Sequence, residues 1–500
     1  MNAIEAMKGA LNVTRTENGD IAYKSTGLAC LDFFSLCGGM RGNIKDLERL
    51  FIKAYNEDPI IAVKTLFYMR NIRGGLGERE SFRSLLKDLA LLYPKTAEKV
   101  IYAVSVYGRW DDLLCLLKTP VKKRVIALIK EQLEKDKCAL QEGKCVSLLG
   151  KWLPSVNASS KNSGVCANIL MKSFSLKAVE YRKLCTALRK EIKIIENSLR
   201  QKDYSFDYEK QPSQALFHYR KAFLRNDKER YKDFLKKAIL EAKKTSLNTK
   251  TLYPYQITAP FIDYHSWGVN ILSEEEKLPL EASWQSLDRS SFDSKTIVVR
   301  DGSGSMYHNT SLSPINIANS LTLLFAEELK GEYKNSFITF SSEPELVVIP
   351  EICDTLEKKI IYMSQFGSCL NTDIAKVFEL ILQIAKNNSV PKEDMIGRVL
   401  IISDMEFDSC VSGVSTFENY KSDFATFGYK MPEVVFWNVE ARSTHFPVTK
   451  NEVGVKLVSG ASASIFRDVV SGDLKEVTPY NFMLKVLEPY SEFESLLINA

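Results

Sequence analysis

Several residue patterns that identify enzymes and metalloproteins are missing from this sequence. Only four of its 500 residues are histidine, and its ten cysteines form no Cys-x-x-Cys pair, so a zinc site of clustered Cys and His ligands is not expected. The sequence contains neither a Gly-x-Ser-x-Gly elbow nor a Gly-x-x-x-x-Gly-Lys-Ser/Thr loop, which hold the nucleophile of many hydrolases and the phosphates of nucleotides. No catalytic residue is predicted, and we expect a protein that is not an enzyme.

Long hydrophobic runs are missing as well. No uninterrupted apolar segment approaches about 18 residues, the length of a transmembrane helix, so no membrane partner is expected. The N-terminus, MNAIEAMKGALNVTRTENGD, lacks the basic and then apolar layout of a signal peptide. Since the cysteines are also scattered, we expect free thiols and a cytoplasmic protein.

Charge is unevenly distributed along the chain, although the net charge is only +5. Residues 1–250 carry 47 Lys and Arg against 28 Asp and Glu, a balance of +19, so residues 251–500 carry −14. Such an asymmetry indicates an anionic partner for the first half, with RNA as the leading candidate. Two alternatives stay open: Lys-rich helix faces that are simply solvated, and docking of the basic half on the acidic half of the same chain.

The two halves also differ in hydrophobic periodicity. In the first half, apolar residues recur every three or four positions in paired segments, which predicts helix pairs stacked as an α-solenoid. The segment 180–201 is expected to form one long amphipathic helix. From about residue 290, β-branched runs alternate with helical segments, which predicts a mostly parallel sheet covered on both faces. We therefore expect an α + α/β protein, with a basic helical domain at 1–285 and a doubly wound α/β domain at 286–500.

One strand of the predicted sheet ends in a cluster of oxygen-bearing side chains. The segment TIVVRDGSGSMY places Asp301, Ser303 and Ser305 at alternate positions of a tight turn. Gly302 and Gly304 are expected to let the backbone curl so that the three oxygens converge. Hard oxygen ligands with few charges suit Mg²⁺. The alternative is a loop in which Ser and Asp merely cap a helix.

Two further oxygen ligands are expected beside this turn. In open α/β sheets, binding sites form outside the carboxyl ends of the strands. Asp404 follows the strand RVLIIS, and it lies beside Asp301 if the two strands are neighbours in the sheet. Thr372 stands at the start of a predicted helix, where its hydroxyl can cap the helix or bind a metal.

The complete pattern resembles the metal-ion-dependent adhesion site of von Willebrand factor type A domains, which have a Rossmann-like fold. The five residues that carry the resemblance are Asp301, Ser303, Ser305, Thr372 and Asp404. It implies a Mg²⁺ site, or one for Mn²⁺ or Ca²⁺, with an open position for the carboxylate of an acidic protein ligand. The sequence departs from the usual pattern at Gly302 and Arg300, and an arginine beside the site could weaken cation affinity.

Motifs over most of the chain resemble one protein family. They are LFYMRNIRGGLGERESFRSLLKDLA, YGRWDDLL, GKWLPS, EYRKLCTALRKEI, HYRKAFLRND, LYPYQI and RVLIISDMEFD, spread over about residues 30–480. The family is catalogued as domain of unknown function 2828 and occurs in plants and microbes. It is similar to the TROVE module of the Ro autoantigen, in which HEAT-like helical repeats join a von Willebrand A domain. This resemblance implies a scaffold for small non-coding or single-stranded RNA, and it carries over no individual RNA contact.

Candidate RNA contacts lie in three basic segments of the helical half: the Gly-Gly-x-Gly turn at 74–77, the helix predicted at 180–201 and the segment 217–237. The segment FHYRKAFLRNDKERYKDFLKK interleaves cations, which hold phosphates, with aromatic rings, which stack on bases. Arginines around the Gly-Gly-x-Gly turn form either a phosphate site or pairs with Glu78 or Glu80, and Arg109 is expected to pair internally with Asp111 or Asp112. The predicted contacts are Arg73, Arg79, Arg182, Lys183, Arg189, Arg220, Lys221, Arg225 and Arg230.

Taken together, these patterns predict a non-enzymatic, Ro-like RNA-binding scaffold. Its Mg²⁺-dependent von Willebrand A domain is expected to recruit a partner or to close the ring of helices. The main alternative is a metal-dependent protein–protein interaction module with no role in RNA binding, and a metal-dependent hydrolase is a third possibility. Salt distinguishes the first two, because phosphate contacts weaken steeply as the salt concentration rises.

Overall fold

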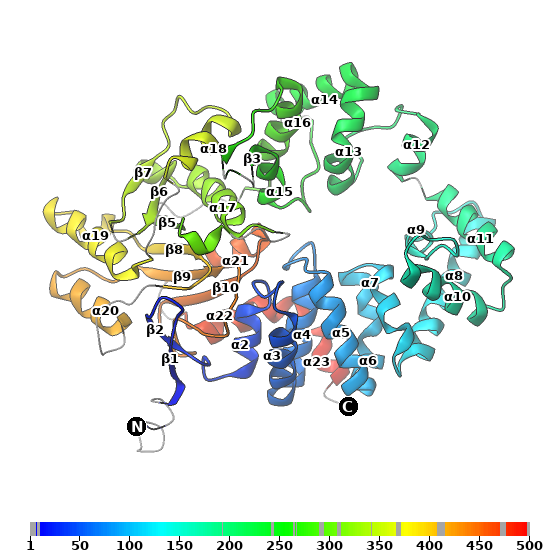
Figure 1. Ribbon diagram of the computed structural model, residues 1–500, viewed down its shortest axis with the longest axis horizontal. Helices are drawn as coiled ribbons and strands as arrows, with labels where there is room; N and C mark the ends of the chain where they lie inside the picture. Colours follow the sequence, from blue (N-terminus) through cyan, green and yellow to red (C-terminus); the bar gives the residue numbers. More distant parts are fainter. Residues whose placement is uncertain are drawn as a thin grey trace. The chain divides into compact units, whose positions relative to one another are not determined.

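The chain forms two compact units, and each is assembled from separate stretches of sequence (Figure 1). The sheet unit contains residues 1–58 and 212–488, and the helical unit contains residues 59–211 and 489–500. The predicted division at residue 285 follows the order of the chain, whereas the packing joins the first segment to the sheet and the last to the helices. The computed structural model describes residues 7, 11–192, 194–241, 245–263, 266, 268–289, 295–307, 312–341, 343–366, 372–407, 416–470 and 477–497.

The core of the sheet unit is a six-stranded, mostly parallel sheet. Its strands are β5 (Thr296–Asp301), β6 (Ser336–Phe340), β7 (Leu346–Val348), β8 (Arg398–Ser403), β9 (Glu433–Asn438) and β10 (Val455–Ser459). They lie in the order β10-β9-β8-β5-β6-β7, and only the edge pair β6–β7 is antiparallel. All residues of the five parallel strands are buried, because helices cover the sheet, and this explains their largely apolar runs. The predicted combination of α and α/β structure is confirmed.

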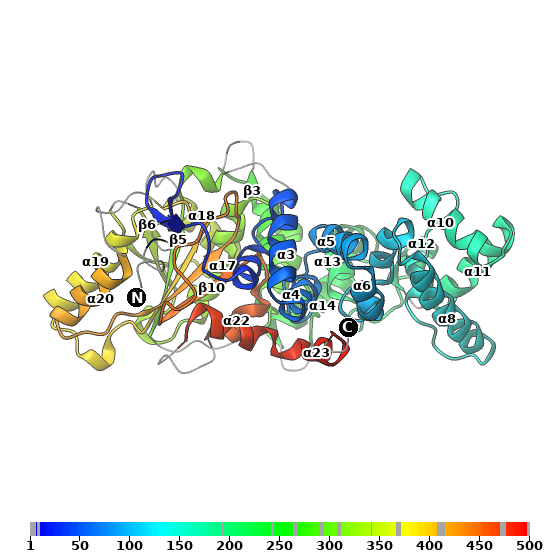
Figure 2. The ribbon, with the colours of Figure 1, turned by 90° about the horizontal axis from the view of Figure 1, so that it is seen from below.

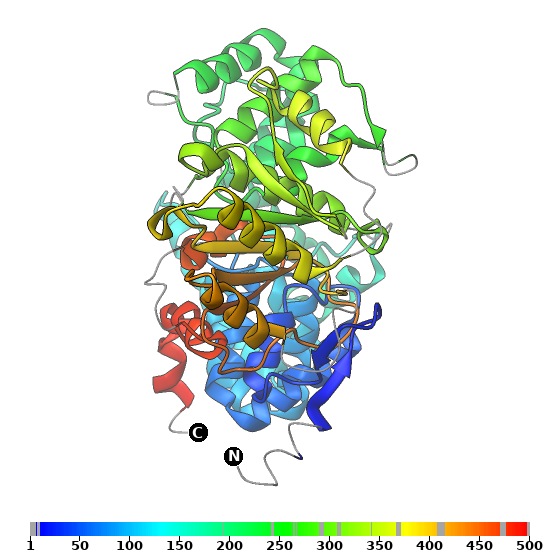
Figure 3. The same ribbon diagram turned by 90° about the vertical axis from the view of Figure 1, so that its left-hand side faces the viewer.

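Helices pack on both faces of the sheet. On one face α17 (Pro314–Glu328) contacts β5, β6 and β8, and its Phe325 ring lies 5.3 Å from that of Trp437. On the other face α19 (Ile374–Asn387) packs against α20 (Thr416–Thr426), whose Phe417 ring lies 5.9 Å from that of Phe436 (Figure 3). The adjacent residues Phe436 and Trp437 of β9 therefore point to opposite faces, as a strand requires.

Further helices of the sheet unit extend α17 into a helical layer. They are α13 (Ser213–Asn226), α14 (Lys228–Leu240), α15 (Pro254–Thr258), α16 (Glu274–Gln285), α18 (Leu356–Ser364), α21 (Phe466–Val470) and α22 (Pro479–Leu487). Two short strands, β3 (Ile262–Asp263) and β4 (Gly268–Val269), pair between α15 and α16. Helix α16 contacts α13, α14, α15 and α18, so the basic segment 212–240 packs on an acidic helix of the same unit.

The N-terminal segment is also part of the sheet unit, which the sequence pattern did not predict. It forms a hairpin of β1 (Val13–Arg15) and β2 (Ile21–Tyr23), followed by α2 (Ala29–Leu36) and α3 (Ile44–Glu57). Helix α2 lies beside β10 and α22 (Figure 1). The backbones of Tyr23 and Phe446 exchange two hydrogen bonds of 2.9 Å, which extend the hairpin onto the loop before β10.

The helical unit consists of helices, mostly short, of which α8 with 20 residues is the longest described. They are α4 (Pro59–Arg70), α5 (Glu80–Leu92), α6 (Pro94–Val100), α7 (Val104–Tyr107), the 3₁₀ helix η2 (Trp110–Lys118), α8 (Lys122–Gln141), α9 (Leu149–Trp152), α10 (Lys161–Ser173), α11 (Ala178–Glu191), α12 (Ile195–Gln201) and α23 (Glu492–Leu497). The predicted single helix at 180–201 is wrong: it is two helices, α11 and α12. Asn197 bonds the carbonyls of Arg189 and Ile192 at 2.8 and 3.2 Å, so its side chain satisfies the end of α11.

The described residues also bear on membrane-spanning helices and on disulfide bonds. No helix in the described ranges has the length and apolar character that crossing a membrane requires. The eight cysteines that the structure describes form no disulfide bond, in agreement with the expected free thiols.

The C-terminal helix α23 completes the helical unit by packing against α4 and α6 (Figure 2). The Phe493 ring is fully buried and stacks on Phe67 with centroids 4.5 Å apart. Glu492 accepts hydrogen bonds of 3.0 Å from Tyr102 and 2.6 Å from Tyr107. The last segment of the chain is therefore part of the core of the helical unit.

Replacing Phe493 with Ala is expected to lower the free energy of unfolding by about 3–5 kcal/mol, because the change leaves a cavity next to Phe67. Denaturant unfolding measures the loss, and hydrogen exchange should assign it to residues 59–211. Phe427→Ala is the control, because Phe427 is 44% exposed and should change stability by less than about 0.5 kcal/mol. Equal effects of the two substitutions would contradict a core role for α23.

Candidate functional site

The predicted cation ligands meet where two neighbouring strands end. Strands β5 and β8 pair in parallel, with Arg300 opposite Ile402, so Asp301 at the end of β5 lies beside the end of β8. From β5 the chain continues to β6 on one side, and from β8 it continues to β9 on the other. This reversal of direction is the topological switch point, outside which open α/β sheets bind their ligands.

Asp301 organises the turn after β5. Its Oδ1 atom accepts a hydrogen bond from the Ser303 amide at 2.8 Å, and its Oδ2 atom accepts one from the Ser403 hydroxyl at 2.5 Å. The hydroxyls of Ser303 and Ser305 lie 2.9 Å apart. The three predicted oxygens therefore converge. Gly302 and Gly304 do not have a positive φ, however, so the turn does not depend on the backbone conformation that only glycine adopts readily.

Asp404 belongs to the loop after β8, and Thr372, which lies just before α19, bonds this loop. The Asp404 Oδ1 atom accepts a hydrogen bond of 3.3 Å from the Glu406 amide, and the Thr372 hydroxyl donates one of 2.9 Å to the Glu406 carbonyl. Asp373, and not Thr372, caps α19, since its carboxylate accepts bonds from two amides of the first turn. Met405 has a φ of +68°, so this tight loop holds a buried side chain in the left-handed region.

The site concentrates negative charge in the interior. Asp301 and Asp404 are 0% and 2% exposed, and burial together with the charge of Asp404 raises the pKa of Asp301 to about 7. Glu406 is also buried, and burial raises its pKa. Carboxylates this close in an interior are stabilised by a counter-ion, and their shared environment is suited to a cation.

Arg300, whose position raised doubt about cation binding, points away from the carboxylates. Its Nη1 atom bonds the side chain of Asn319 at 3.0 Å, and its guanidinium also reaches the carbonyls of Met363 and Phe366 at the end of α18. Successive residues of a strand face opposite sides of the sheet, which separates Arg300 from Asp301. Arg300 therefore fixes α18 and does not occupy the candidate site.

Three neighbours of the site were not predicted from the sequence. Ser403 bonds Asp301, and its place directly before Asp404 was a signal that could have identified it. Arg442 donates a 3.0 Å bond to Asp404 Oδ2, and His445 lies 3.2 Å from the Met405 carbonyl. No local pattern marks Arg442 or His445, because both come from the loop after β9.

The donor atoms of the site fit a hard cation. They are two carboxylates and three hydroxyls, and Mg²⁺ prefers such oxygen ligands. Within the described ranges no three His, Cys, Asp or Glu side chains gather as a metal site, so the hydroxyls are needed to complete the ligand set. Zinc, which favours Cys and His, does not fit.

The nine predicted RNA contacts are divided between the two units, and the structure does not place them in one cluster. Arg73, Arg182, Lys183 and Arg225 are exposed, and none has an acidic partner among the described residues. Arg79, Lys221 and Arg230 form ion pairs with Glu80, Glu276 and Asp227.

Three predicted contacts bond the protein backbone through their side chains: Arg182 lies 3.3 Å from the Ala178 carbonyl, and Arg189 and Arg220 make shorter bonds. Arg189 bonds the carbonyls of Gly150 and Leu153 at 3.0 and 2.6 Å. Arg220 bonds the carbonyl of Phe217 at 2.7 Å and lies over its ring, and burial lowers the pKa of its guanidinium. Both arginines have a structural role in the positions described.

The Gly-Gly-x-Gly turn is shaped by packing. A Cβ atom on Gly75 would lie 2.0 Å from the Tyr68 carbonyl, and Gly77 has a φ of +69°. The glycines are therefore required to bring the turn against the end of α4, and Arg79 pairs with Glu80 at 2.8 Å. These contacts favour the inter-helix turn over the phosphate site.

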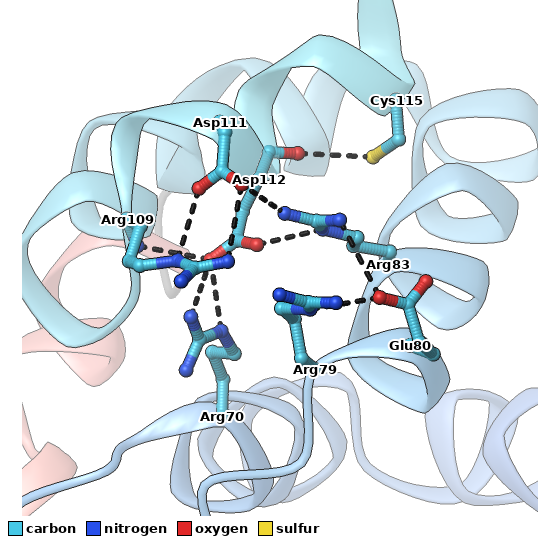
Figure 4. A network of polar contacts seen from close by, with 8 residues as sticks. All are labelled: Arg70, Arg79, Glu80, Arg83, Arg109, Asp111, Asp112 and Cys115. Atoms are coloured by element: carbon cyan, nitrogen blue, oxygen red, sulfur yellow. Dashed lines mark hydrogen bonds and ion pairs between the residues drawn. The ribbon is translucent and has the colours of Figure 1, made fainter. Parts of the chain in front are cut away.

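A network of buried charges lies behind this turn (Figure 4). The Asp112 carboxylate is fully buried and binds Arg70 at 2.8 Å and Arg83 at 2.7 Å. Asp111 binds Arg83 at 2.7 Å and Arg109 at 3.0 Å. The expected internal pairing of Arg109 is confirmed, and the network links α4, α5 and η2 without an external ligand.

Asp112→Asn is expected to lower the free energy of unfolding by about 3–5 kcal/mol, because Arg70 and Arg83 keep their charges in the interior without the shared carboxylate. Denaturant unfolding of the full chain is the measurement. Glu80→Gln, which removes a surface partner of Arg79 and Arg83, should cost less than about 1 kcal/mol. Similar losses in the two variants would show that burial does not set the strength of this network.

Comparison with known proteins identifies the family. The profile of a Domain of unknown function (DUF7788) matches residues 295–479, and that of a Domain of unknown function (DUF2828) matches residues 16–130 and 121–296. The Uncharacterized protein L728 of Acanthamoeba polyphaga mimivirus is 30% identical over 518 residues, which cover 96% of this chain and 88% of that protein. Among solved structures, the Ro (RSR) protein of Deinococcus radiodurans aligns over 91% of this chain and 93% of its own, with 12% identity and a TM-score of 0.40. Because the second profile spans more than half of the chain, the protein belongs to the DUF2828 family.

Proposed function

We propose that the sheet unit contains a von Willebrand factor type A-like domain that binds Mg²⁺, and through it an acidic group of a protein partner. The observation that carries the proposal is the pair of buried carboxylates, Asp301 and Asp404, at the switch point of the sheet. The hydroxyls of Ser303, Ser305 and Thr372 complete the ligands. Numbered from β5, the strand order is 3-2-1-4-5-6, a doubly wound order that supports this assignment.

A bound Mg²⁺ would neutralise the buried carboxylates and offer a coordination position to an acidic group. The chain's own residues hold the site in shape: Ser403 orients Asp301, and the Glu406 amide orients Asp404. We place no catalytic residue here and propose a binding role. A metal-dependent hydrolase is the enzymatic rival, and it would lose turnover in Asp404→Ala while the protein stays folded.

The effect of Mg²⁺ on stability is expected to depend on pH. The pKa of Asp301 is about 7 in the folded protein, against an ordinary value of 3.8, so the folded state holds a proton that the unfolded chain has lost. The stability of the cation-free protein should therefore fall as the pH rises from about 4 towards about 7. Mg²⁺ replaces this proton, so the increase in Tm that it causes should grow over the same range.

Thermal unfolding with and without Mg²⁺ measures this effect, and calorimetry in two buffers measures the released proton. Asp301→Asn should lose both the Mg²⁺ effect and its pH dependence. Asp354→Asn is the control, because Asp354 only pairs with Lys358 on the surface. An equal effect of Mg²⁺ on Asp301→Asn and on the unchanged protein would rule out the proposed cation site.

We further propose that the helical unit binds RNA, so that the protein is a two-part scaffold of the Ro kind. The specific support is the charge of this unit: it carries 29 basic and 18 acidic residues, a net charge of +11. On α10–α12 and the adjoining loops (Figure 2), exposed cations have no acidic partner among the described residues: Lys161, Lys172, Lys177, Arg182, Lys183, Lys190, Arg200 and Lys202. Unpaired cations are available to phosphates, whereas Lys221, Lys228 and Lys232 of α13 and α14 already pair with glutamates of α16.

Changing Arg182, Lys183 and Lys190 together to Glu should weaken binding of a labelled single-stranded RNA. The slope of log affinity against log salt, measured between about 50 and about 200 mM, should become shallower by about 2, since three phosphate contacts are lost. The control is the triple change of Lys135, Lys137 and Lys144 to Glu, which alters charge equally at lysines already paired with glutamates. Equal losses in both triple variants, or no RNA binding at all, would favour the alternative of a protein–protein module without RNA.

A further inference from the structure

The tip of the N-terminal hairpin is fixed on the loop that carries Asp404. The Thr16 hydroxyl donates a 2.5 Å hydrogen bond to the Phe407 carbonyl, and the side-chain amide of Asn18 donates one of 2.7 Å to the Glu406 carbonyl. Between them, the backbone amide of Glu17 donates a 2.9 Å hydrogen bond to Glu406 Oε2. Three consecutive residues of the hairpin therefore bind Glu406 and Phe407. These bonds fix the backbone of Glu17 beside the candidate site.

The Glu17 side chain extends from this fixed backbone towards Asp404. One guanidinium joins them: Arg442 Nη1 lies 3.1 Å from Glu17 Oε2, and Arg442 Nη2 lies 3.0 Å from Asp404 Oδ2. The Glu17 carboxylate is half exposed, so its rotamer can change without breaking the backbone contacts. An internal cation thus already holds these two carboxylates together.

The charges around this guanidinium do not balance. Asp301, Asp404 and Glu406 are buried carboxylates, and Glu17 adds a fourth at the surface. The Glu406 Oε1 atom is buried and has no hydrogen-bond partner among the described residues. Arg442 and His445, whose Nε2 atom lies 3.6 Å from Glu406 Oε2, carry at most two positive charges against four acids, so the excess negative charge can still be balanced by a divalent cation next to the hairpin tip.

We propose that Glu17, supplied by the chain's own N-terminal hairpin, is an internal acidic ligand of the cation site. This inference rests on the proposed function of that site. Arg442 then holds the carboxylate in place while no cation is bound, and the cation takes over as its counter-ion. Because the hairpin is tied down by Thr16, Asn18 and Tyr23, Glu17 is present at a high effective concentration. An acidic group of a partner must displace Glu17 to bind, so the hairpin regulates access to the cation.

A simpler alternative is that Glu17 acts only on Arg442. Removing Glu17 would then let the guanidinium pair more strongly with Asp404 and compete with the cation, without Glu17 ever meeting it. The two explanations differ once Arg442 is neutral: a direct ligand still matters, and an indirect one does not. A double-mutant cycle on Glu17 and Arg442 separates them.

The experiment is calorimetric titration of Mn²⁺ alone into the full-length protein and its Glu17→Gln, Arg442→Gln and doubly substituted forms. Glu17→Gln retains the backbone bond to Glu406, and it should weaken Mn²⁺ binding by about tenfold in both backgrounds, within the range for loss of a group around a metal site. Glu452→Gln is the matched control. Glu452 lies before the start of β10, at the end of the sheet opposite the candidate site, and pairs there with Lys421. This substitution should leave the affinity unchanged.

The outcomes separate the two proposals. If Glu17→Gln has no effect in the Arg442→Gln background, Glu17 is not a ligand and the inference fails. The cation site itself still stands in that case, provided that Asp404→Ala abolishes Mn²⁺ binding. If neither the unchanged protein nor Arg442→Gln binds Mn²⁺, the cation site fails first. Thermal unfolding of each variant checks that the comparison is made between folded proteins.

Discussion

The constraint on which the sheet unit depends is the enforced proximity of two buried carboxylates. Parallel pairing of β5 with β8 fixes the positions of Asp301 and Asp404, because both strands end at the same edge of the sheet. Neither acid can turn to water, since both are almost completely buried. The negative charge must therefore be balanced from within the loops, by hydroxyls, by amides, by a guanidinium and by any cation that the site takes up. The raised pKa of Asp301 is the direct consequence of this placement.

Much of the surrounding structure follows from that charge. The loop after β8 keeps Met405 in the left-handed region, which turns the Glu406 amide towards Asp404. Strained backbone persists only where neighbours hold it, and here the hairpin tip binds the next two residues, Glu406 and Phe407. Arg442 pairs with both Glu17 of this tip and Asp404. A segment close to the start of the chain is thus part of the site because the loop needs support and charge, which links the order of the polypeptide to the chemistry at the sheet edge.

The sequence predicted the elements that depend on local pattern and missed those that depend on distant partners. Each strand of the sheet was recognisable as a β-branched run, and Asp301 and Asp404 could be placed together because parallel strands share an edge. Arg442 and Glu17 could not be found in this way, since their contacts with the site join residues far apart in sequence and no period marks them. The basic residues show the same limit: composition identified cations, but whether Lys221 meets Glu276 or Arg189 meets a backbone carbonyl is decided by packing between helices.

The division of the chain into units changes the argument from charge. By halves of the sequence the balance is +19 against −14, which overstates the contrast, because the basic helices α13 and α14 belong to the sheet unit, where Lys221, Lys228 and Lys232 pair with α16. By units the balance is +11 for the helical unit and −6 for the sheet unit. The net positive charge is therefore concentrated in the helical unit, and the buried carboxylates of the candidate site belong to the sheet unit. Without a cation the acidic site repels an anion, whereas the net positive charge of the helical unit attracts one, so an acidic partner can reach the sheet edge only once a cation is bound there.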